Sequence, residues 1–314
     1  MSAWGRLKVG ETIGEGAFGE VYRAFDPVGG CDVALKLMRP RPTGDRPRTR
    51  ALREYRNLAK VHHPNVVEAY GVGVEGRRAG LWMELVRGAT LAQMLQTRGP
   101  FTGEEAAFVG QALCRALAAV HAAGLVHADV KVQNVMQAEC GRTVLMDFGA
   151  SLRHTATRTR RARLTGTLVY LAPEVLSGGR PSIAADIYSL GVLLFLLVTG
   201  RYPVYGSSFA ELARAHAYGC VWRLKRLNPD VPDAFAEAVE GALEDISRRY
   251  RSAAEMGAAL SAVVPAVPAF TVTRQDTAVA PVVVSFPLAF GNTTTRSGEW
   301  ATRDGSIGPS RCSA

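Results

Sequence analysis

The sequence predicts an α+β protein in which a small β-rich lobe precedes a larger helical lobe. Over residues 7–38, apolar and polar residues alternate around glycine-rich turns, which is typical of strands. From residue 90 onward, apolar residues recur at helical spacing instead. Strands that come first and helices that follow indicate two lobes.

The first lobe, at about residues 7–85, is expected to hold one helix among its strands. Leu52, Tyr55 and Leu58 lie at helical spacing after a loop rich in proline and arginine. We expect this loop at residues 39–50, the helix at 51–61, and strands at 7–14, 20–24, 31–38, 66–74 and 79–85.

The second lobe, at about residues 90–264, is expected to be mostly helical. Thr102 and Glu105 form a capping-box pattern, which opens a long helix that runs to residue 123. The other predicted elements are a strand pair at residues 135–136 and 144–146 and helices at 183–199, 208–217, 233–243 and 252–262.

The two lobes make one predicted domain at residues 7–264. Residues 265–314 differ in composition, because they are rich in proline, threonine, serine, glycine and valine and lack helical periodicity. A strand around residues 277–291 would be interrupted by Pro281 and Pro287. We therefore expect a largely disordered tail.

The chain has 314 residues, of which 47% are hydrophobic and 21% charged, as in a soluble globular protein. Much of its net charge of +9 comes from arginine clusters within residues 39–53 and 153–163. No aromatic residue interleaves with either cluster, whereas a nucleic-acid platform needs aromatic side chains for stacking. We expect no nucleic-acid partner.

Cysteine usage and hydropathy bear on the compartment. The apolar run at residues 190–198 is far shorter than the roughly 20 residues of a membrane span, so it predicts a buried helix and no membrane partner. The N-terminus shows no apolar signal segment. Five widely separated cysteines without metal-site spacing are typical of free thiols in a reducing compartment, here the cytoplasm: Cys31, Cys114, Cys140, Cys220 and Cys312.

A glycine-rich motif, GEGAFGEV at residues 14–21, lies between two predicted strands. Gly14, Gly16 and Gly19 let a hairpin lie close to nucleotide phosphates, and Val21 can cover the base. A dinucleotide-binding loop of similar pattern should open a helix, whereas a strand follows here.

Lys36 lies on the apolar third strand and needs an anion there. The phosphates of a nucleotide and a helix glutamate are the natural anions. Glu54 is the one glutamate between Glu20 and Glu68, and it lies on the predicted helix.

The segment HADVKVQN at residues 127–134 and the triplet DFG at 147–149 carry the reacting groups. Asp129 is suited to orient an attacking hydroxyl, and Lys131 to neutralise a phosphoryl group in transfer. Asn134 and Asp147 offer oxygen atoms for a hard cation such as Mg²⁺. The set predicts phosphoryl transfer.

Three later motifs complete the series: GTLVYLAPE at residues 166–174, DIYSLG at 186–191, and Arg249. In this order and spacing, the motifs resemble those of eukaryotic-type (Hanks-type) protein kinases, and in particular of bacterial serine/threonine protein kinases. The resemblance covers residues 7 to about 262. It implies the bilobal protein kinase fold, ATP with Mg²⁺ (or Mn²⁺ in its place), and serine or threonine hydroxyls of proteins as substrates.

The resemblance also implies further roles. Thr167 would bond Asp129 and Lys131, Glu174 would pair with Arg249, and Asp186 would anchor the catalytic loop. Phe148 would stack with Leu58 and His127 in a regulatory spine. The residues that it implies around ATP are Ile13, Val21, Ala34, the gatekeeper Met83, the hinge residues Glu84, Leu85 and Val86, and Met136.

Ala128 departs from the family pattern, which usually has arginine there. Such an arginine pairs with a phosphate on the activation segment, which alanine cannot do. Autophosphorylation is expected among Thr155, Thr157, Thr159 and Thr165, with weak dependence of activity on it. The alternatives are a pseudokinase or nucleotide-binding scaffold and a small-molecule phosphotransferase; the sequence leaves the oligomeric state open.

Overall fold

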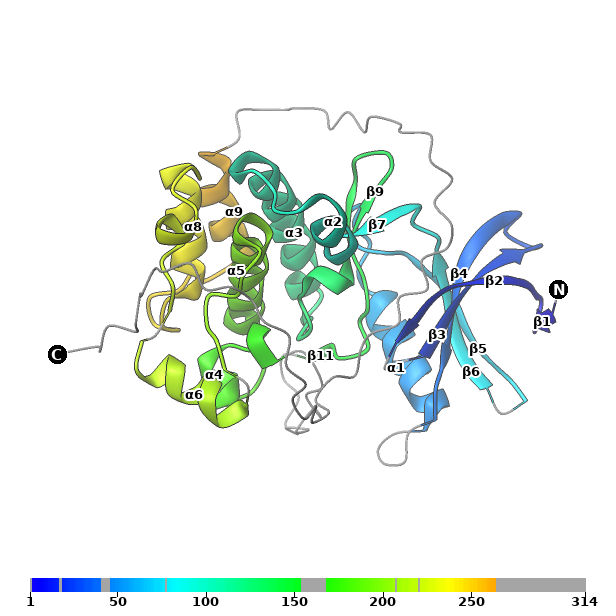
Figure 1. Ribbon diagram of the computed structural model, residues 1–314. Helices are drawn as coiled ribbons and strands as arrows, with labels where there is room; N and C mark the ends of the chain where they lie inside the picture. Colours follow the sequence, from blue (N-terminus) through cyan, green and yellow to red (C-terminus); the bar gives the residue numbers. More distant parts are fainter. Residues whose placement is uncertain are drawn as a thin grey trace, which may run out of the picture.

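The computed structural model has the predicted α+β architecture with two lobes (Figure 1). It describes residues 2–16, 19–40, 46–76, 78–153, 168–206, 208–219 and 221–263. The expected tail at 265–314 therefore lies outside the described residues, as do Thr165, Thr167 and the other activation-segment threonines.

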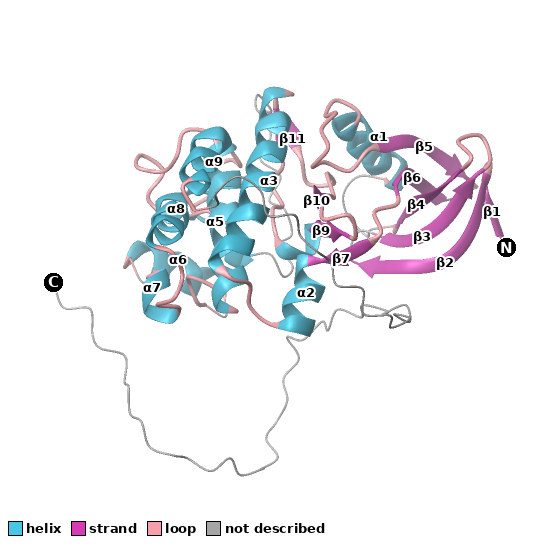
Figure 2. Ribbon diagram, turned by 90° about the horizontal axis from the view of Figure 1, so that it is seen from above, coloured by secondary structure: helices cyan, strands magenta, loops and turns pink. Residues whose placement is uncertain are grey.

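The N-terminal lobe is built on an antiparallel sheet of six strands in the order β1-β2-β3-β4-β6-β5. Five of them lie close to predicted strands, and the sheet strongly curls in both views (Figures 1 and 2). The strands are β1 (Ser2–Trp4), β2 (Leu7–Gly16), β3 (Gly19–Asp26), β4 (Cys31–Met38), β5 (Ala69–Glu75) and β6 (Arg78–Glu84).

Helix α1 (Pro47–Leu58) begins and ends earlier than the predicted 51–61. Pro47 occupies the first turn, where proline needs no amide hydrogen, so the proline-rich loop ends at the helix start rather than at residue 50. The helix packs on β5 and β6 through its buried face, which includes Ala51, Glu54 and Leu58.

Strand β1 was not predicted, because three residues are too few to show alternation. It pairs with β2 and places Trp4 in a small core with Leu7 and Leu35. The indole of Trp82 packs edge-on against Trp4, with ring centroids 6.0 Å apart. A Cβ atom on Gly71 would lie 2.2 Å from the Trp82 ring, so glycine is required there.

The C-terminal lobe is helical, as predicted. Its centre is α5 (Ile183–Thr199), which is buried along most of its length and packs on α3 and α8. Among the described residues, no helix is both long and apolar enough to span a membrane. The remaining helices are α2 (Leu91–Arg98), α3 (Gly103–Ala122), α4 (Pro173–Leu176), α6 (Phe209–Ala217), α7 (Leu224–Leu227), α8 (Asp233–Leu243) and α9 (Ala253–Ser261).

Short strands lie at the junction of the two lobes (Figures 1 and 2). They carry the loops at residues 127–131 and 146–149 on their ends, which places the predicted reacting groups between the lobes. One set is β7 (Gly88–Thr90), β9 (Val135–Ala138) and β10 (Thr143–Leu145); the other is β8 (Leu125–Val126) with β11 (Leu152–Arg153), and a 3-10 turn covers Val132–Asn134.

Candidate active site

A buried ionic cluster joins β4, α1 and the segment after β10. The Nζ atom of Lys36 lies 2.7 Å from Oε1 of Glu54 and 2.9 Å from Oδ1 of Asp147. The side chain of Lys36 is only 8% exposed and that of Glu54 only 3%. The structure thus brings together three residues that the sequence predicted to act on a nucleotide.

The charged groups of this cluster shift one another's pKa values. Burial alone lowers the pKa of Lys36, but the carboxylates of Asp147 and Glu54 outweigh burial and raise it overall. Burial raises the pKa of Asp147, yet the Lys36 ammonium outweighs this effect, so the pKa of Asp147 is lowered. Burial is the largest cause that raises the pKa of Glu54; the Lys36 ammonium opposes it, and the nearby Asp147 carboxylate raises the pKa further. Of the two carboxylates that share the Lys36 ammonium, Glu54 is the more buried and has the raised pKa.

A second cluster lies in the loop at residues 127–134. Lys131 donates from Nζ to both carboxylate oxygens of Asp129, at 2.9 and 2.8 Å. Asn134 donates from Nδ2 to the backbone oxygen of Asp129 and to its Oδ2, at 2.8 and 2.9 Å. Two side chains therefore fix the Asp129 carboxylate.

The clusters around Lys36 and Asp129 lie close enough to interact electrostatically. Burial is the largest cause that raises the pKa of Asp129; Lys131 opposes it, and the carboxylate of Asp147 raises it further. In turn, the Lys131 ammonium contributes to the lowered pKa of Asp147. Asp129 and Asp147 thus lie near each other where the two lobes meet.

Asp186 on α5 holds the backbone that leads into Asp129. Its Oδ2 accepts from the amide of His127 and its Oδ1 from the amide of Ala128, both at 2.8 Å. Ala128 has a φ of 63°, an uncommon conformation for a residue with a side chain. The two hydrogen bonds hold the backbone in this strained turn.

The DFG triplet packs on the same loop. Asp147 also has a positive φ, 60°, and its Oδ1 accepts from the amide of Gly149 at 3.1 Å. The rings of His127 and Phe148 meet edge to face, with centroids 4.8 Å apart. Leu58 of α1 lies in the same buried core, so α1 and the catalytic loop share one apolar support.

The residues expected around ATP lie on neighbouring strands of the N-terminal sheet. Val21 is directly opposite Lys36 in the pairing of β3 with β4, and Ala34 is opposite Met83 in that of β4 with β6. Gly19 approaches β4 so closely that a Cβ atom would lie 2.0 Å from the oxygen of Leu37.

The other expected ATP-binding residues continue this surface. Gly14 and Gly16 lie at the end of β2, and Ile13 beside them is 40% exposed. Glu84 ends β6 and pairs with Arg142, while Val86 and Met136 pack at the lobe junction. All therefore lie in or next to the region where the lobes meet.

Oxygen atoms suited to a hard cation remain available. Both hydrogen bonds of Asn134 use its amide nitrogen, which leaves Oδ1 without a bond among the described residues. Asp147 accepts from Lys36 and Gly149 through Oδ1, and its Oδ2 accepts no hydrogen bond from the described residues. An amide oxygen and a carboxylate oxygen are donors that fit Mg²⁺.

An ion pair in the helical lobe supports the segment after residue 168. Arg249 donates to both carboxylate oxygens of Glu174, at 2.7 and 3.3 Å, and its side chain is fully buried. Its guanidinium also bonds the backbone oxygen of Ala184 and lies 5.0 Å from the ring centre of Tyr188.

Three further residues hold the site and were not predicted. Asn57 donates from α1 to the backbone oxygen of Ser151, at 3.1 Å. The hydroxyl of Ser151 donates in turn to the backbone oxygen of His127, at 3.2 Å. Nε2 of His121 lies 2.9 Å from Oδ2 of Asp186. Asn57 follows Glu54 by three residues on the same helix face, which was a usable signal; Ser151 and His121 have no comparable pattern.

Comparisons with known proteins agree with this geometry. Residues 7–248 match the family model described as protein kinase domain. The chain is 36% identical over 272 residues to serine/threonine-protein kinase PknL of Mycobacterium tuberculosis, covering 85% of this chain and 68% of that protein. It is 33% identical over 257 residues to PrkC of Bacillus subtilis, covering 81% of this chain and 40% of that one. Against PknE of Mycobacterium bovis it is 31% identical over 305 residues, covering 95% and 54%. The chain thus spans only part of the length of these relatives.

Proposed function

Since the chain belongs to the protein kinase family, we propose that it is a serine/threonine protein kinase that transfers the γ-phosphoryl group of ATP to protein hydroxyl groups. The observation that carries the proposal is the pair of ionic clusters that lie near each other, one around Lys36 and one around Asp129. Curated relatives named serine/threonine-protein kinases support the substrate class.

Each charged group has a task in this reaction. Lys36, which Glu54 holds in place, binds the phosphates of ATP. Asp129 accepts the proton of the attacking hydroxyl or orients it, and Lys131 neutralises charge on the phosphoryl group. Ala34, Val21 and Met136 enclose the base, and the backbone from Glu84 to Val86 reads its edge.

Asn134 and Asp147 are the residues that would hold Mg²⁺, with Mn²⁺ as a substitute. The metal ion supplies positive charge that offsets the phosphate oxygens and orients them. Asn134 is fixed for this task by its bonds to Asp129, and Asp147 by its bonds to Lys36 and Gly149.

Glu174 with Arg249 supports the segment that docks protein substrates, and Asp186 supports the catalytic loop. We further propose that the domain acts in the cytoplasm, where ATP is available, and phosphorylates its own activation segment. Thr167 would there bond Asp129 and Lys131.

The test is phosphate transfer by the purified full chain. Radiolabelled ATP with Mg²⁺ and a generic basic protein should give labelled protein for wild type and a loss of at least about a hundredfold for Asp129→Asn. Asp230→Asn, at an exposed turn, is the matched control and should stay near wild type. Nucleotide binding without transfer in wild type would favour the scaffold instead, and label confined to small molecules would favour a small-molecule phosphotransferase.

A further inference from the structure

A chain of buried hydrogen bonds runs from α1 through Ser151 to the loop at residues 127–134. The side-chain amide of Asn57 donates to the backbone oxygen of Ser151, and the hydroxyl of Ser151 donates to the backbone oxygen of His127. All three residues are buried, so these bonds are shielded from water. We refer to the two bonds as the Ser151 connection. It links the N-terminal lobe with the loop that carries Asp129.

Ser151 lies at the joint between the DFG turn and strand β11. Its amide donates to the backbone oxygen of Phe148 at 3.1 Å. Beyond it, Leu152 pairs with Val126 where β11 runs antiparallel to β8. The same register, extended by one residue, places Ser151 opposite His127. Because the turn uses the amide of Ser151, its hydroxyl bonds the oxygen of His127 instead. A ladder of two residue pairs is weak by itself, so the hydroxyl adds a needed link between the two segments.

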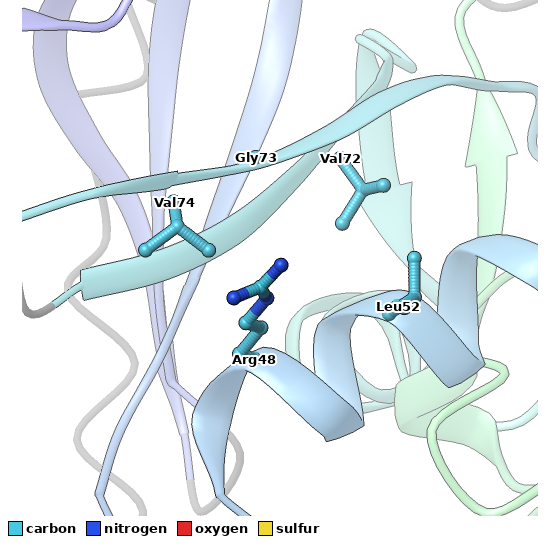
Figure 3. A pocket seen from close by; sticks show the side chains of 5 residues that line it. All are labelled: Arg48, Leu52, Val72, Gly73 and Val74. Atoms are coloured by element: carbon cyan, nitrogen blue, oxygen red, sulfur yellow. The ribbon is translucent and has the colours of Figure 1, made fainter.

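Asn57 lies on the face of α1 that also carries Glu54, because the two residues are three apart on the helix. This face binds Lys36 through Glu54 and the DFG segment through Asn57. Another face of α1 carries Arg48 and Leu52, which line a pocket of about 310 Å³ together with Val72, Gly73 and Val74 of β5 (Figure 3). The described links from α1 to the site therefore run through the face of Glu54 and Asn57.

The Ser151 connection joins neutral groups that are present in the unmodified chain. A phosphate on the activation segment would need a cation to bind it, and the methyl group of Ala128 offers none. The neighbouring backbone oxygen of His127 is bonded to Ser151 without any phosphate. The start of the activation segment is therefore tied to the loop beside Ala128 by hydrogen bonds that need no modification.

We propose that Asn57 and Ser151 are positioning residues that hold the DFG segment against the loop at residues 127–134 without a phosphate on the activation segment. Ser151 acts through the backbone of His127, and Asn57 acts through the backbone of Ser151. The effect on activity rests on the proposed kinase function. The Ser151 connection itself can be measured without phosphate transfer.

Amide hydrogen exchange on the purified full chain, without nucleotide, tests whether the connection holds the segment. Ser151→Ala and Asn57→Ala each remove one neutral hydrogen bond, so exchange of residues 148–153 should be about threefold to tenfold faster than in wild type. The matched control is Asn228→Ala, which breaks a bond of the same kind, to the backbone oxygen of Val198 at 2.9 Å. It should leave exchange of residues 148–153 unchanged. Unchanged exchange in Ser151→Ala, or an equal rise in Asn228→Ala, would overturn the proposal.

Steady-state kinetics with ATP and a generic basic protein test the positioning role. We expect kcat to fall about threefold to tenfold in Ser151→Ala and in Asn57→Ala, while KM for the protein stays within about twofold, because no substrate contact is lost. The double variant should lose little more than the larger single loss, since both changes break one connection. Asn228→Ala should keep the wild-type kcat. Wild-type kcat in Ser151→Ala, despite faster exchange, would overturn the positioning role.

Independence from phosphate is tested in a chain in which Thr155, Thr157, Thr159 and Thr165 are all replaced with alanine. Ser151→Ala should lower kcat there by the same factor as in the wild-type background. A fall of less than about twofold in that background would overturn the proposal, because the connection would then act only with a phosphorylated segment. If the wild type transfers no phosphate, the proposed kinase function fails, and the exchange rates still decide whether the Ser151 connection holds the segment.

Discussion

Glu54 and Asp147 come from different lobes and bind the same ammonium group, that of Lys36. The inner face of α1 is thereby tied to the DFG segment. Asn57 adds a second tie from the same helix to the backbone of Ser151. The position of α1 thus controls whether both lobes present their charged groups to one space.

Glu54→Gln keeps the shape of this side chain and removes its charge. Asp147 still holds Lys36, so we expect folding to survive with a loss of about 1–2 kcal/mol in the free energy of unfolding. The catalytic efficiency for ATP should fall at least tenfold, about 1.4 kcal/mol, because α1 no longer fixes Lys36. Steady-state kinetics at varied ATP and urea unfolding measure the two effects. Glu139→Gln, an exposed residue, should change neither; wild-type efficiency in Glu54→Gln would remove the pair from the mechanism.

The pair of Glu174 and Arg249 should respond unequally to loss of its two partners. The Arg249 side chain is fully buried, whereas that of Glu174 is 22% exposed. Arginine cannot lose its proton, so Glu174→Gln leaves a buried charge without its counterion and should cost about 3 kcal/mol or more of unfolding free energy. In Arg249→Met, the backbone oxygens of Glu244 and Ala184 lose a donor, but the Glu174 carboxylate stays partly hydrated. We therefore expect Arg249→Met to lose less unfolding free energy than Glu174→Gln.

Urea unfolding of both variants measures this contrast. Glu255→Gln, at an exposed helix start, serves as a control for loss of a glutamate charge. A cost for Glu174→Gln below about 1 kcal/mol, typical of a surface pair, would contradict the buried arrangement.

His216 on α6 makes stability depend on pH. Burial, the largest cause, lowers its pKa; the Glu174 carboxylate opposes this, and Arg249 adds to it. The unfolded histidine, with a pKa of about 6.5, therefore binds protons more tightly than the folded one. Its stabilising contribution is fully present above the unfolded pKa and is lost as pH falls through the folded pKa.

We therefore expect wild type to lose more thermal stability between pH 7.5 and pH 5 than His216→Gln does. Scanning calorimetry at the two pH values measures the difference. His62→Gln, at an exposed position, should keep the wild-type dependence. Equal losses in wild type and His216→Gln would show that this histidine does not carry the effect.

Periodicity and motif spacing were sufficient for most of this fold. The helix at 183–199 and the strand at 31–38 were predicted with their observed bounds, because both are long, apolar and bounded by polar or glycine residues. The start of α1 was missed because Pro47 and its neighbouring arginines are typical of a loop, although proline also fits a first helical turn.

Contacts between distant segments were out of reach of the sequence. His121 bonds Asp186 from another helix, and Trp4 packs on Trp82 across the sheet. The pocket at Arg48 likewise depends on how α1 lies on β5. Such contacts are set by tertiary packing, which local patterns do not record. The motif residues, in contrast, keep a fixed spacing within short loops.

Ala128 carries the last prediction, which concerns activation. Its backbone is held by Asp186, but its methyl group cannot pair with a phosphate. Replacing Thr155, Thr157, Thr159 and Thr165 together with alanine should therefore lower kcat less than tenfold, about 1.4 kcal/mol. Ala128→Arg should restore a dependence on these threonines, so the same replacement in that background should lower kcat further. Thr167→Ala serves as the contrast and should lower kcat strongly by itself. If the four threonine replacements lower kcat more than tenfold while Ala128 is present, another cationic side chain binds the phosphate of the activation segment.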